Sequence, residues 1–258
     1  MLNFASKTSA AFLATCFLVA YSVLPLTSIQ AGELTAYREL IPNSNDFFEL
    51  IDLLPGGEYP GIIVGDKIFS GFMYQFTGDM PTSDLINITG IQVDGHYGIR
   101  IQGGFKDLFD PGNQSSDALL NFDVRVMDPQ RYLISDVHLS GNPSLSQPPE
   151  NVLNAFAEVV ETVSGSFGSI ELRTQSDLNG PSVPAWIDPL PWPVETLHVS
   201  KDIQLFSSIE NDIATRATIS QIDQTFSQIP VEVPEPMGIL LSGFAALVTL
   251  STRRCFRE

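Results

Sequence analysis

Carboxylate and amide side chains are the groups whose types and spacing come closest to a chemical site in this chain. Asp107 and Asp110 lie on either side of a turn that contains phenylalanine, and Asp177 and Asn179 lie beside a glycine turn. Oxygen ligands in short loops are the ones that calcium prefers, so these four residues are candidate calcium ligands. Asp and Asn are also common turn residues because they bond to their own backbone, so the alternative is that they only form turns.

Aromatic side chains offer a second kind of chemistry, the stacking of sugar rings. Trp186 and Trp192 lie in the proline-rich stretch 181–193, and Tyr97 begins an alternating apolar stretch. Flat aromatic faces predict a carbohydrate-binding or polysaccharide-modifying module, and the alternative is that the tryptophans pack a loop against the domain. Because proline lacks an N–H and fixes φ, we predict a long ordered loop over 181–193.

The familiar catalytic patterns are missing from the sequence. His96, His138 and His198 do not form the closely spaced pairs that are typical of metal sites. Ser164 and Ser166 lack the Gly-x-Ser-x-Gly context of many hydrolases, and there is no P-loop and no Gly-x-Gly-x-x-Gly motif. A glycosidase needs two convergent carboxylates, which one sequence does not reveal. We therefore predict a non-catalytic protein without a cofactor or a metal.

Charge and cysteine content narrow the classes of partner. Residues 32–233 contain 28 acidic and nine basic residues, which gives this part of the chain a net charge of −19. Such a surface repels nucleic acid, so we predict no nucleic-acid partner. The two cysteines, Cys16 and Cys255, lie near the ends of the chain, so the part between them has no disulfide and no thiolate metal site.

Alternation of apolar and polar residues predicts strands through most of the middle of the chain. Leu120, Phe122, Val124 and Val126 alternate with polar residues, and this period of two is typical of a half-buried strand. Similar stretches cover residues 67–76, 85–93, 97–105, 132–139, 169–173, 196–206 and 214–226. Turn-forming clusters separate these stretches, so we predict an all-β fold, namely an antiparallel β-sandwich that is jelly-roll-like.

Two local features of this pattern lead to further expectations. The apolar phase changes at Gly90, which predicts a β-bulge there. Residues 151–160 fit a helix, whereas 158–163 fits a strand, and the strand is slightly favoured.

The N-terminus has the features of a secretory signal peptide. Lys7 precedes an apolar run over 10–26, and Ala31 supplies a small residue for cleavage. We predict cleavage after Ala31, and an uncleaved anchor is the alternative because Ile29 is bulky for its place in the cleavage site.

The C-terminus combines a rigid motif, an apolar segment and a basic end. Pro234 and Pro236 flank Glu235 and follow Val233, so this motif is extended and accessible. The uncharged stretch 237–252 would form a helix of roughly 24 Å, which is short for a bilayer core of about 30 Å. The basic end contains Arg253, Arg254 and Arg257. These arginines favour a cytoplasmic C-terminus, which leaves the preceding residues on the exported side.

Together these features closely resemble the PEP-CTERM sorting tail of bacterial exported proteins. In that family an exosortase, a membrane-embedded cysteine peptidase, recognises and processes the tail. The resemblance implies export through the general secretion machinery, a transient inner-membrane stage, and a final place at the cell surface or outside the cell. An ordinary single-span anchor is the alternative. One departure is that Cys255 and Phe256 interrupt the basic end.

The resulting organisation has three parts: a signal peptide over 1–31, a β-sandwich ectodomain over 32–232 and a sorting tail over 233–258. Within the tail, the motif covers 234–236, the transmembrane segment 237–252 and the basic end 253–258. The stretches 65–70, 97–105, 135–139 and 222–228 resemble an uncharacterised ectodomain of PEP-CTERM proteins, and this resemblance implies no catalytic activity. We predict a non-catalytic surface or extracellular-matrix protein, and the alternative is the carbohydrate-binding module, with extracellular polysaccharide as its partner.

Overall fold

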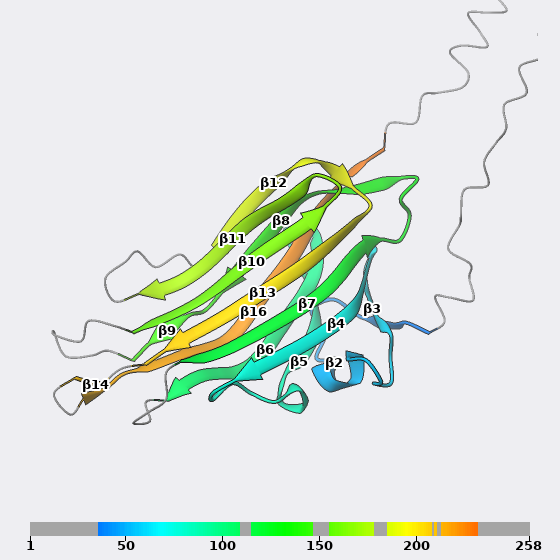
Figure 1. Cartoon of the computed structure of the whole chain (residues 1–258). Coiled ribbons are helices and arrows are strands. Elements are labelled where there is room, and N and C mark those ends of the chain that lie inside the picture. Colours follow the sequence, from blue (N-terminus) through cyan, green and yellow to red (C-terminus); the bar gives the residue numbers. More distant parts are fainter. Residues whose placement is uncertain are drawn as a thin grey trace, which may run out of the picture.

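The computed structural model describes residues 36–108, 115–146, 155–177, 185–207, 209–210 and 213–231 of the 258-residue chain. These residues form β-strands and two short 3-10 helices, η1 (Leu50–Leu53) and η2 (Ser83–Leu85), and the same residues contain no α-helix. Most strands belong to two stacked sheets (Figure 1). The prediction of an all-β sandwich is therefore confirmed.

Sheet 1 contains seven strands. In spatial order they are β1 (Arg38–Leu40), β3 (Gly61–Val64), β4 (Lys67–Thr77), β7 (Ser116–Val126), β13 (Thr196–Phe206), β10 (Phe156–Gly165) and β11 (Gly168–Asp177). Neighbouring strands are antiparallel except for β1 and β3, which are parallel.

Sheet 2 is the second layer. In spatial order it contains β12 (Ala185–Val194), β8 (Tyr132–Gly141), β16 (Arg216–Pro230), β6 (His96–Leu108), β5 (Asn87–Val93) and β2 (Phe47–Glu49), and β9 (Ser144–Leu145) also pairs with β16. A separate two-stranded ribbon joins β14 (Ile209–Glu210) to β15 (Ile213–Ala214). The chain passes repeatedly between the layers, so that β6, β7 and β8 lie in sheets 2, 1 and 2 respectively.

The predicted strands match the observed ones closely. Residues 120–126 lie in β7 and residues 196–206 form β13, and in both strands alternate side chains are buried. The strand alternative for 158–163 is confirmed, because these residues lie in β10.

The predicted loop over 181–193 is wrong, because residues 185–194 form strand β12. The reason lies in the position of this strand. Among the described residues it is the edge strand of sheet 2 and pairs only with β8, and its register shifts between Pro189 and Val194. An edge strand tolerates proline because one of its sides needs no ladder hydrogen bonds.

The predicted bulge at Gly90 is also wrong. The pairing of β5 with β6 runs without a register shift from Asn87 to Val93. A Cβ atom on Gly90 would lie 3.1 Å from a Val64 side-chain atom and 3.2 Å from the Leu40 Cβ. The glycine therefore permits close packing of β5 on sheet 1.

The core lies between the two sheets and is rich in phenylalanine. Phe69 and Phe122 from sheet 1 have ring centroids 6.1 Å apart, and Phe69 lies 6.0 Å from Phe226 of sheet 2. All three side chains are at most 1% exposed. This contact across the layers fixes how sheet 1 and sheet 2 face each other.

Candidate functional site

The residues predicted for export and sorting lie outside the described residues: Ala31, Val233, Pro234, Glu235, Pro236, Arg253, Arg254 and Arg257. The part that the structure describes includes the strand before the tail. β16 continues to Pro230, and the backbone N–H of Val231 donates to the carbonyl of Arg131 at 2.8 Å. In the described part of the chain, no helix has the length and apolar character needed to cross a membrane.

The predicted sugar-stacking residues lie in different local environments. Trp192 is 49% exposed, its Nε1 donates to Ser166 Oγ at 3.2 Å, and its ring meets Phe167 edge-on at 6.3 Å. Tyr97 is half-buried, and its ring lies against the backbone of Gly65 in the β3–β4 turn. Trp186 lies in β12 opposite Leu139 of β8, and its side chain is outside the described part. Trp192 thus packs on the β10–β11 turn and keeps an exposed ring.

The predicted calcium ligands are only partly described. Asp107 is 3% exposed, and its carboxylate accepts hydrogen bonds from Ser116 Oγ and from the backbone N–H of Ser207, both at 2.6 Å. Asp110 and Asn179 lie outside the described residues, as does the side chain of Asp177 at the end of β11. The described residues contain no group of three or more His, Cys, Asp or Glu side chains placed to hold a metal ion.

The structure brings two of the three histidines together, which the sequence did not predict. His96 of β6 and His138 of β8 have ring centroids 5.1 Å apart. His138 Nε2 lies 2.6 Å from Asp136 Oδ1 and 2.9 Å from Ser227 Oγ. A Ser-His-Asp triad uses one ring nitrogen for the serine and the other for the carboxylate, whereas here both partners contact the same nitrogen. This arrangement does not activate Ser227 as a nucleophile.

An acidic pair lies on the outer face of sheet 1. Asp117 of β7 and Asp202 of β13 line a groove of about 360 Å³ together with Phe76. Burial, and secondarily the charge of Asp202, raise the pKa of Asp117. Spacing along the chain gave no sign of this pair, because its members are far apart in sequence.

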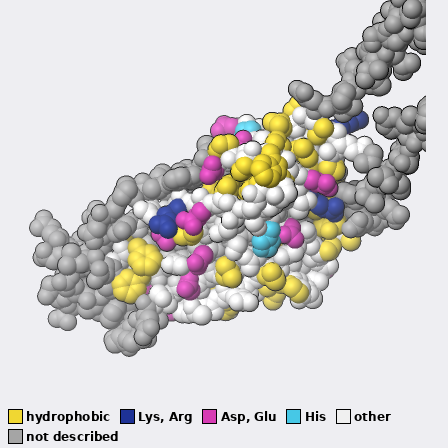
Figure 2. Space-filling view, turned by 45° about the horizontal axis from the view of Figure 1, so that its top comes forward, with side chains coloured by type: hydrophobic (Ala, Val, Ile, Leu, Met, Phe, Trp, Pro, Cys, Tyr) yellow, Lys and Arg dark blue, Asp and Glu magenta, His cyan; other side chains and the backbone are white. Residues whose placement is uncertain are grey.

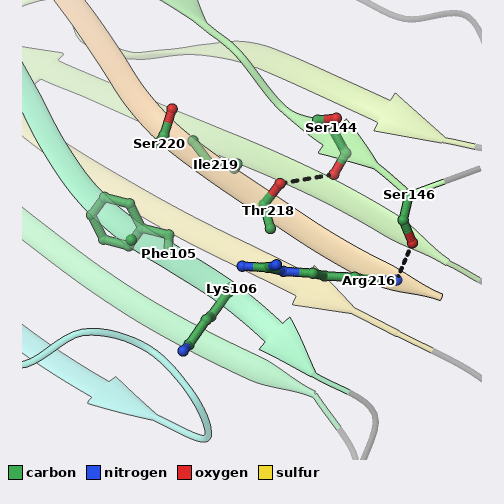
Figure 3. Close-up of a pocket in the computed structure, with 9 residues that line it drawn as sticks. Phe105, Lys106, Ser144, Ser146, Arg216, Thr218, Ile219 and Ser220 are labelled. Atoms are coloured by element: carbon green, nitrogen blue, oxygen red, sulfur yellow. Dashed lines mark hydrogen bonds between the residues drawn. The ribbon is translucent and has the colours of Figure 1, made fainter. Parts of the chain in front are cut away.

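A groove with basic and hydroxyl side chains lies on the outer face of sheet 2 (Figure 3). We call it the basic groove. Its volume is about 530 Å³, and its polar lining consists of Lys106, Ser144, Ser146, Arg216, Thr218 and Ser220. The volume lies within the range of roughly 300–1,000 Å³ that is usual for ligand sites.

Three strands position the side chains of the basic groove. Lys106 of β6 is the register partner of Thr218 on β16, and Arg216 is two residues before Thr218 on the same strand. Residues two apart on a strand share one face, so both basic residues face the groove. β9 forms one wall, where Ser146 Oγ accepts from the backbone N–H of Arg216 at 2.7 Å.

A bulge between β6 and β16 lies beside the groove. The register shifts between Ile219 and Gln221, where Gly103 and Gly104 of β6 lie opposite the single residue Ser220 of β16, so the extra residue belongs to β6. Asn142 stabilises this bulge, because its Oδ1 accepts from the backbone N–H groups of Ser220 and Gln221 at 3.0 and 2.8 Å. Ser220 faces outward in the same alternation as Arg216 and Thr218, so it also lines the groove.

The electrostatics of the basic groove differ from those of the rest of the domain. Figure 2 shows Asp and Glu side chains spread over the visible face and few Lys and Arg side chains. Nine basic residues lie between residues 36 and 231. Five of these form ion pairs with carboxylates, namely Lys67, Arg100, Arg131, Arg173 and Lys201, and two lie over aromatic rings, namely Arg38 and Arg125.

The remaining two basic residues, Lys106 and Arg216, both line the basic groove. Neither forms an ion pair with a carboxylate of the described residues. Two cations with no carboxylate partner among the described residues, beside four hydroxyl groups, form a site that is suited to an anion that also carries hydroxyl groups. Sequence reasoning missed this site because its residues come from three strands, and the only signal was the scarcity of basic residues.

Comparisons with known proteins do not identify a family. No family model matches the chain, and no curated protein matches it. Among solved structures, the chain is similar to a carbohydrate-binding module, TmCBM61, solved in complex with β-1,4-galactotriose, with 10% sequence identity and a TM-score of 0.25. This match covers 60% of the present chain and 88% of the other chain. A TM-score this low carries no argument about the fold or the ligand of the present chain.

Proposed function

We propose that this protein is an exported, non-catalytic β-sandwich whose C-terminal tail is processed by an exosortase. The main structural support is the position of the last strand that the structure describes. β16 lies in the interior of sheet 2, between β8 and β6, and it ends at Pro230, before the Pro234-Glu235-Pro236 motif. Cleavage within the motif would therefore remove none of the described strands.

Replacement of Pro234, Glu235 and Pro236 by alanine tests the sorting proposal. We expect the variant to be exported and to keep its C-terminal tail in the inner membrane, because the extended motif is lost while the apolar span is kept. A matched control replaces Ile229 and Val231, which precede the motif, by alanine and should be processed normally. Normal processing of the motif variant would contradict the proposal.

We further propose that the exported domain binds an acidic polysaccharide of the extracellular matrix through the basic groove. The observation that supports this most directly is that Lys106 and Arg216 are the two basic residues with neither a carboxylate nor an aromatic partner in the described part of the chain. Uronic acid units carry one carboxylate and several hydroxyl groups, which match the two cations and the serine and threonine hydroxyls. The surrounding acidic surface opposes a polyanion at low ionic strength, and physiological salt screens that repulsion beyond about 8 Å.

Affinity electrophoresis in gels that contain polygalacturonate, with dextran as the neutral comparison, tests this binding. We expect polygalacturonate alone to retard the protein, and a Lys106→Gln, Arg216→Gln double variant to lose most of the retardation. Arg131→Gln is the matched control, since Arg131 is also exposed but pairs with Asp128 at 3.4 Å, away from the basic groove. Equal retardation of wild type and double variant would contradict the assignment of the basic groove.

A second candidate is the binding of neutral sugars by aromatic stacking. It is favoured by the exposed ring of Trp192, which Phe167 and Ser166 hold in place. We also propose that the sandwich is jelly-roll-like. Many lectin domains have this arrangement, which agrees with sugar binding. Loss of neutral-glycan binding in Trp192→Ala, with Trp186→Ala as the companion substitution, would support this candidate.

A further inference from the structure

Three polar side chains meet in the core between the two sheets. Lys201 of β13 and Glu161 of β10 are direct register partners in sheet 1, and Gln224 comes from β16 in sheet 2. Lys201 Nζ donates to Glu161 Oε2 and to Gln224 Oε1. All three residues have 0% exposure, so water does not solvate this cluster, which we call the buried triad.

Charges at this position are costly. A fully buried ammonium and carboxylate lose several kcal/mol of hydration each, and pairing offsets only part of that loss. Burial lowers the pKa of Lys201 and raises the pKa of Glu161, although each group partly offsets the shift of the other. Transfer of one proton from Lys201 to Glu161 removes both charges and leaves a neutral, nucleophilic amine.

The amine faces a suitable electrophile. The side-chain amide of Gln224 is held in place, because its Nε2 donates to the carbonyl of His138 at 3.1 Å while its Oε1 accepts from Lys201. Glu161 Oε1 is buried and has no hydrogen-bond partner among the described residues. The carboxyl group of Glu161 can therefore exchange protons with the reacting atoms without first breaking another bond.

We propose that Lys201 and Gln224 become joined by an intramolecular amide bond, with Glu161 as the group that transfers the protons. Lys201 Nζ, as the neutral amine, attacks Cδ of Gln224 and forms the new C–N bond. The bond from Cδ to Nε2 then breaks, and Nε2 leaves as ammonia after receiving the proton that Nζ loses, which passes through the Glu161 carboxyl. No oxidant, reductant or cofactor is needed, and Glu161 ends protonated and uncharged. This inference does not depend on the proposed function.

Such a bond would link sheet 1 to sheet 2 covalently. Both cysteines of the chain lie outside residues 32–232, so the sandwich has no disulfide to serve this purpose. A cross-sheet amide would keep the two layers together when the sandwich partly unfolds.

A second set of a lysine, a glutamine and an acidic residue, with Asp66 in place of a glutamate, provides an internal comparison. Lys67 Nζ lies 2.6 Å from Asp66 Oδ1 and 2.9 Å from Gln228 Oε1, and it also joins strands of the two sheets. The side chain of Asp66 is 33% exposed, however, so water can stabilise the ion pair. We expect this second set to remain unlinked.

Mass spectrometry of the intact, purified protein tests the proposal. The wild-type mass should fall below the sequence mass by about 17 Da, the mass of one ammonia, after allowance for terminal processing. Tandem spectra should place the loss on a branched peptide that joins Lys201 to Gln224, and trypsin should no longer cleave after Lys201. The deficit should disappear in Lys201→Met and in Glu161→Gln and persist in the matched control Lys67→Met.

Several results would overturn the inference. These are a wild-type protein at its full sequence mass, a deficit that maps to other residues, or a loss of about 18 Da that joins Lys201 to Glu161 by release of water. The mass of the wild-type protein shows whether the Lys201–Gln224 bond is present even if a core variant fails to fold. A failure here would leave sorting and ligand binding unaffected, since neither assay involves the buried triad.

Discussion

The contact between Phe69 and Phe226 allows a quantitative test of how the two sheets pack. The rings come from opposite sheets, with centroids 6.0 Å apart and planes inclined by 49°. Replacement of either phenylalanine by leucine should lower the free energy of unfolding by about 1–2 kcal/mol, because buried ring atoms are lost. Contact between two aromatic rings stabilises a fold by about 0.5–1.5 kcal/mol more than the burial of their surface does. Each single variant loses this contribution, and the double variant loses it only once. The double variant should therefore lose less than the sum of the two single losses by about that amount.

Urea unfolding followed by near-ultraviolet circular dichroism measures these free energies. Phe206→Leu combined with Phe226→Leu is the matched control, because Phe206 stacks with Phe156 on neighbouring strands of sheet 1 at 5.9 Å. The losses for this control pair should add within about 0.3–0.5 kcal/mol. If the Phe69 and Phe226 variants were equally additive, the proposed packing of sheet 1 on sheet 2 would be refuted.

Two further substitutions probe specific features of the fold. The raised pKa of Asp117 means that the folded state binds this proton more tightly than the unfolded state does. The stability linked to this group is therefore present at low pH. It declines as the pH rises above 3.8, the ordinary pKa, and through the pKa of the folded state. Asp117→Asn should thus raise the melting temperature more at pH 7 than at pH 4, and an equal rise at both would contradict the raised pKa of Asp117. A Cβ atom on Gly98 would lie 1.8 Å from the Gln224 carbonyl oxygen, so Gly98→Ala should cost about 1–3 kcal/mol or more in urea unfolding by forcing β6 and β16 apart. Wild-type stability of that variant would show that the two strands do not approach so closely.

The strands of the sandwich were largely predictable because apolar and polar residues alternate along a strand whose side chains face the core and the solvent in turn. Leu197, Val199, Ile203 and Leu205 of β13 point to the core at every second position, as their spacing indicated. β12 was missed because the penalty for proline depends on whether a strand lies at an edge, which only the assembled sheet determines. The bulge of β6 opposite Ser220 was missed because it depends on the pairing of β6 with β16 and on Asn142, which are distant in sequence.

The candidate sites were less predictable, because each combines residues from several strands. The sequence nevertheless contained one indication of the buried triad. Lys201 and Glu161 occupy inward positions of otherwise apolar alternating runs, and charges at such positions indicate a buried polar contact. Their partner Gln224 lies in the other sheet, so the contact itself required the fold. Lys106 and Arg216 became a groove only when β6 and β16 were paired.

Export and exosortase processing are tested most directly by determining both termini of the protein that is recovered from outside the producing cells. Terminal peptides from mass spectrometry should begin at Gly32 and end between Val233 and Pro236, which would correspond to the sandwich with its signal peptide and sorting tail removed. Recovery of the protein only from membranes, with Arg253 and Arg254 still present, would mean that the tail is a permanent anchor. That result would contradict the proposal of an exported protein released by an exosortase.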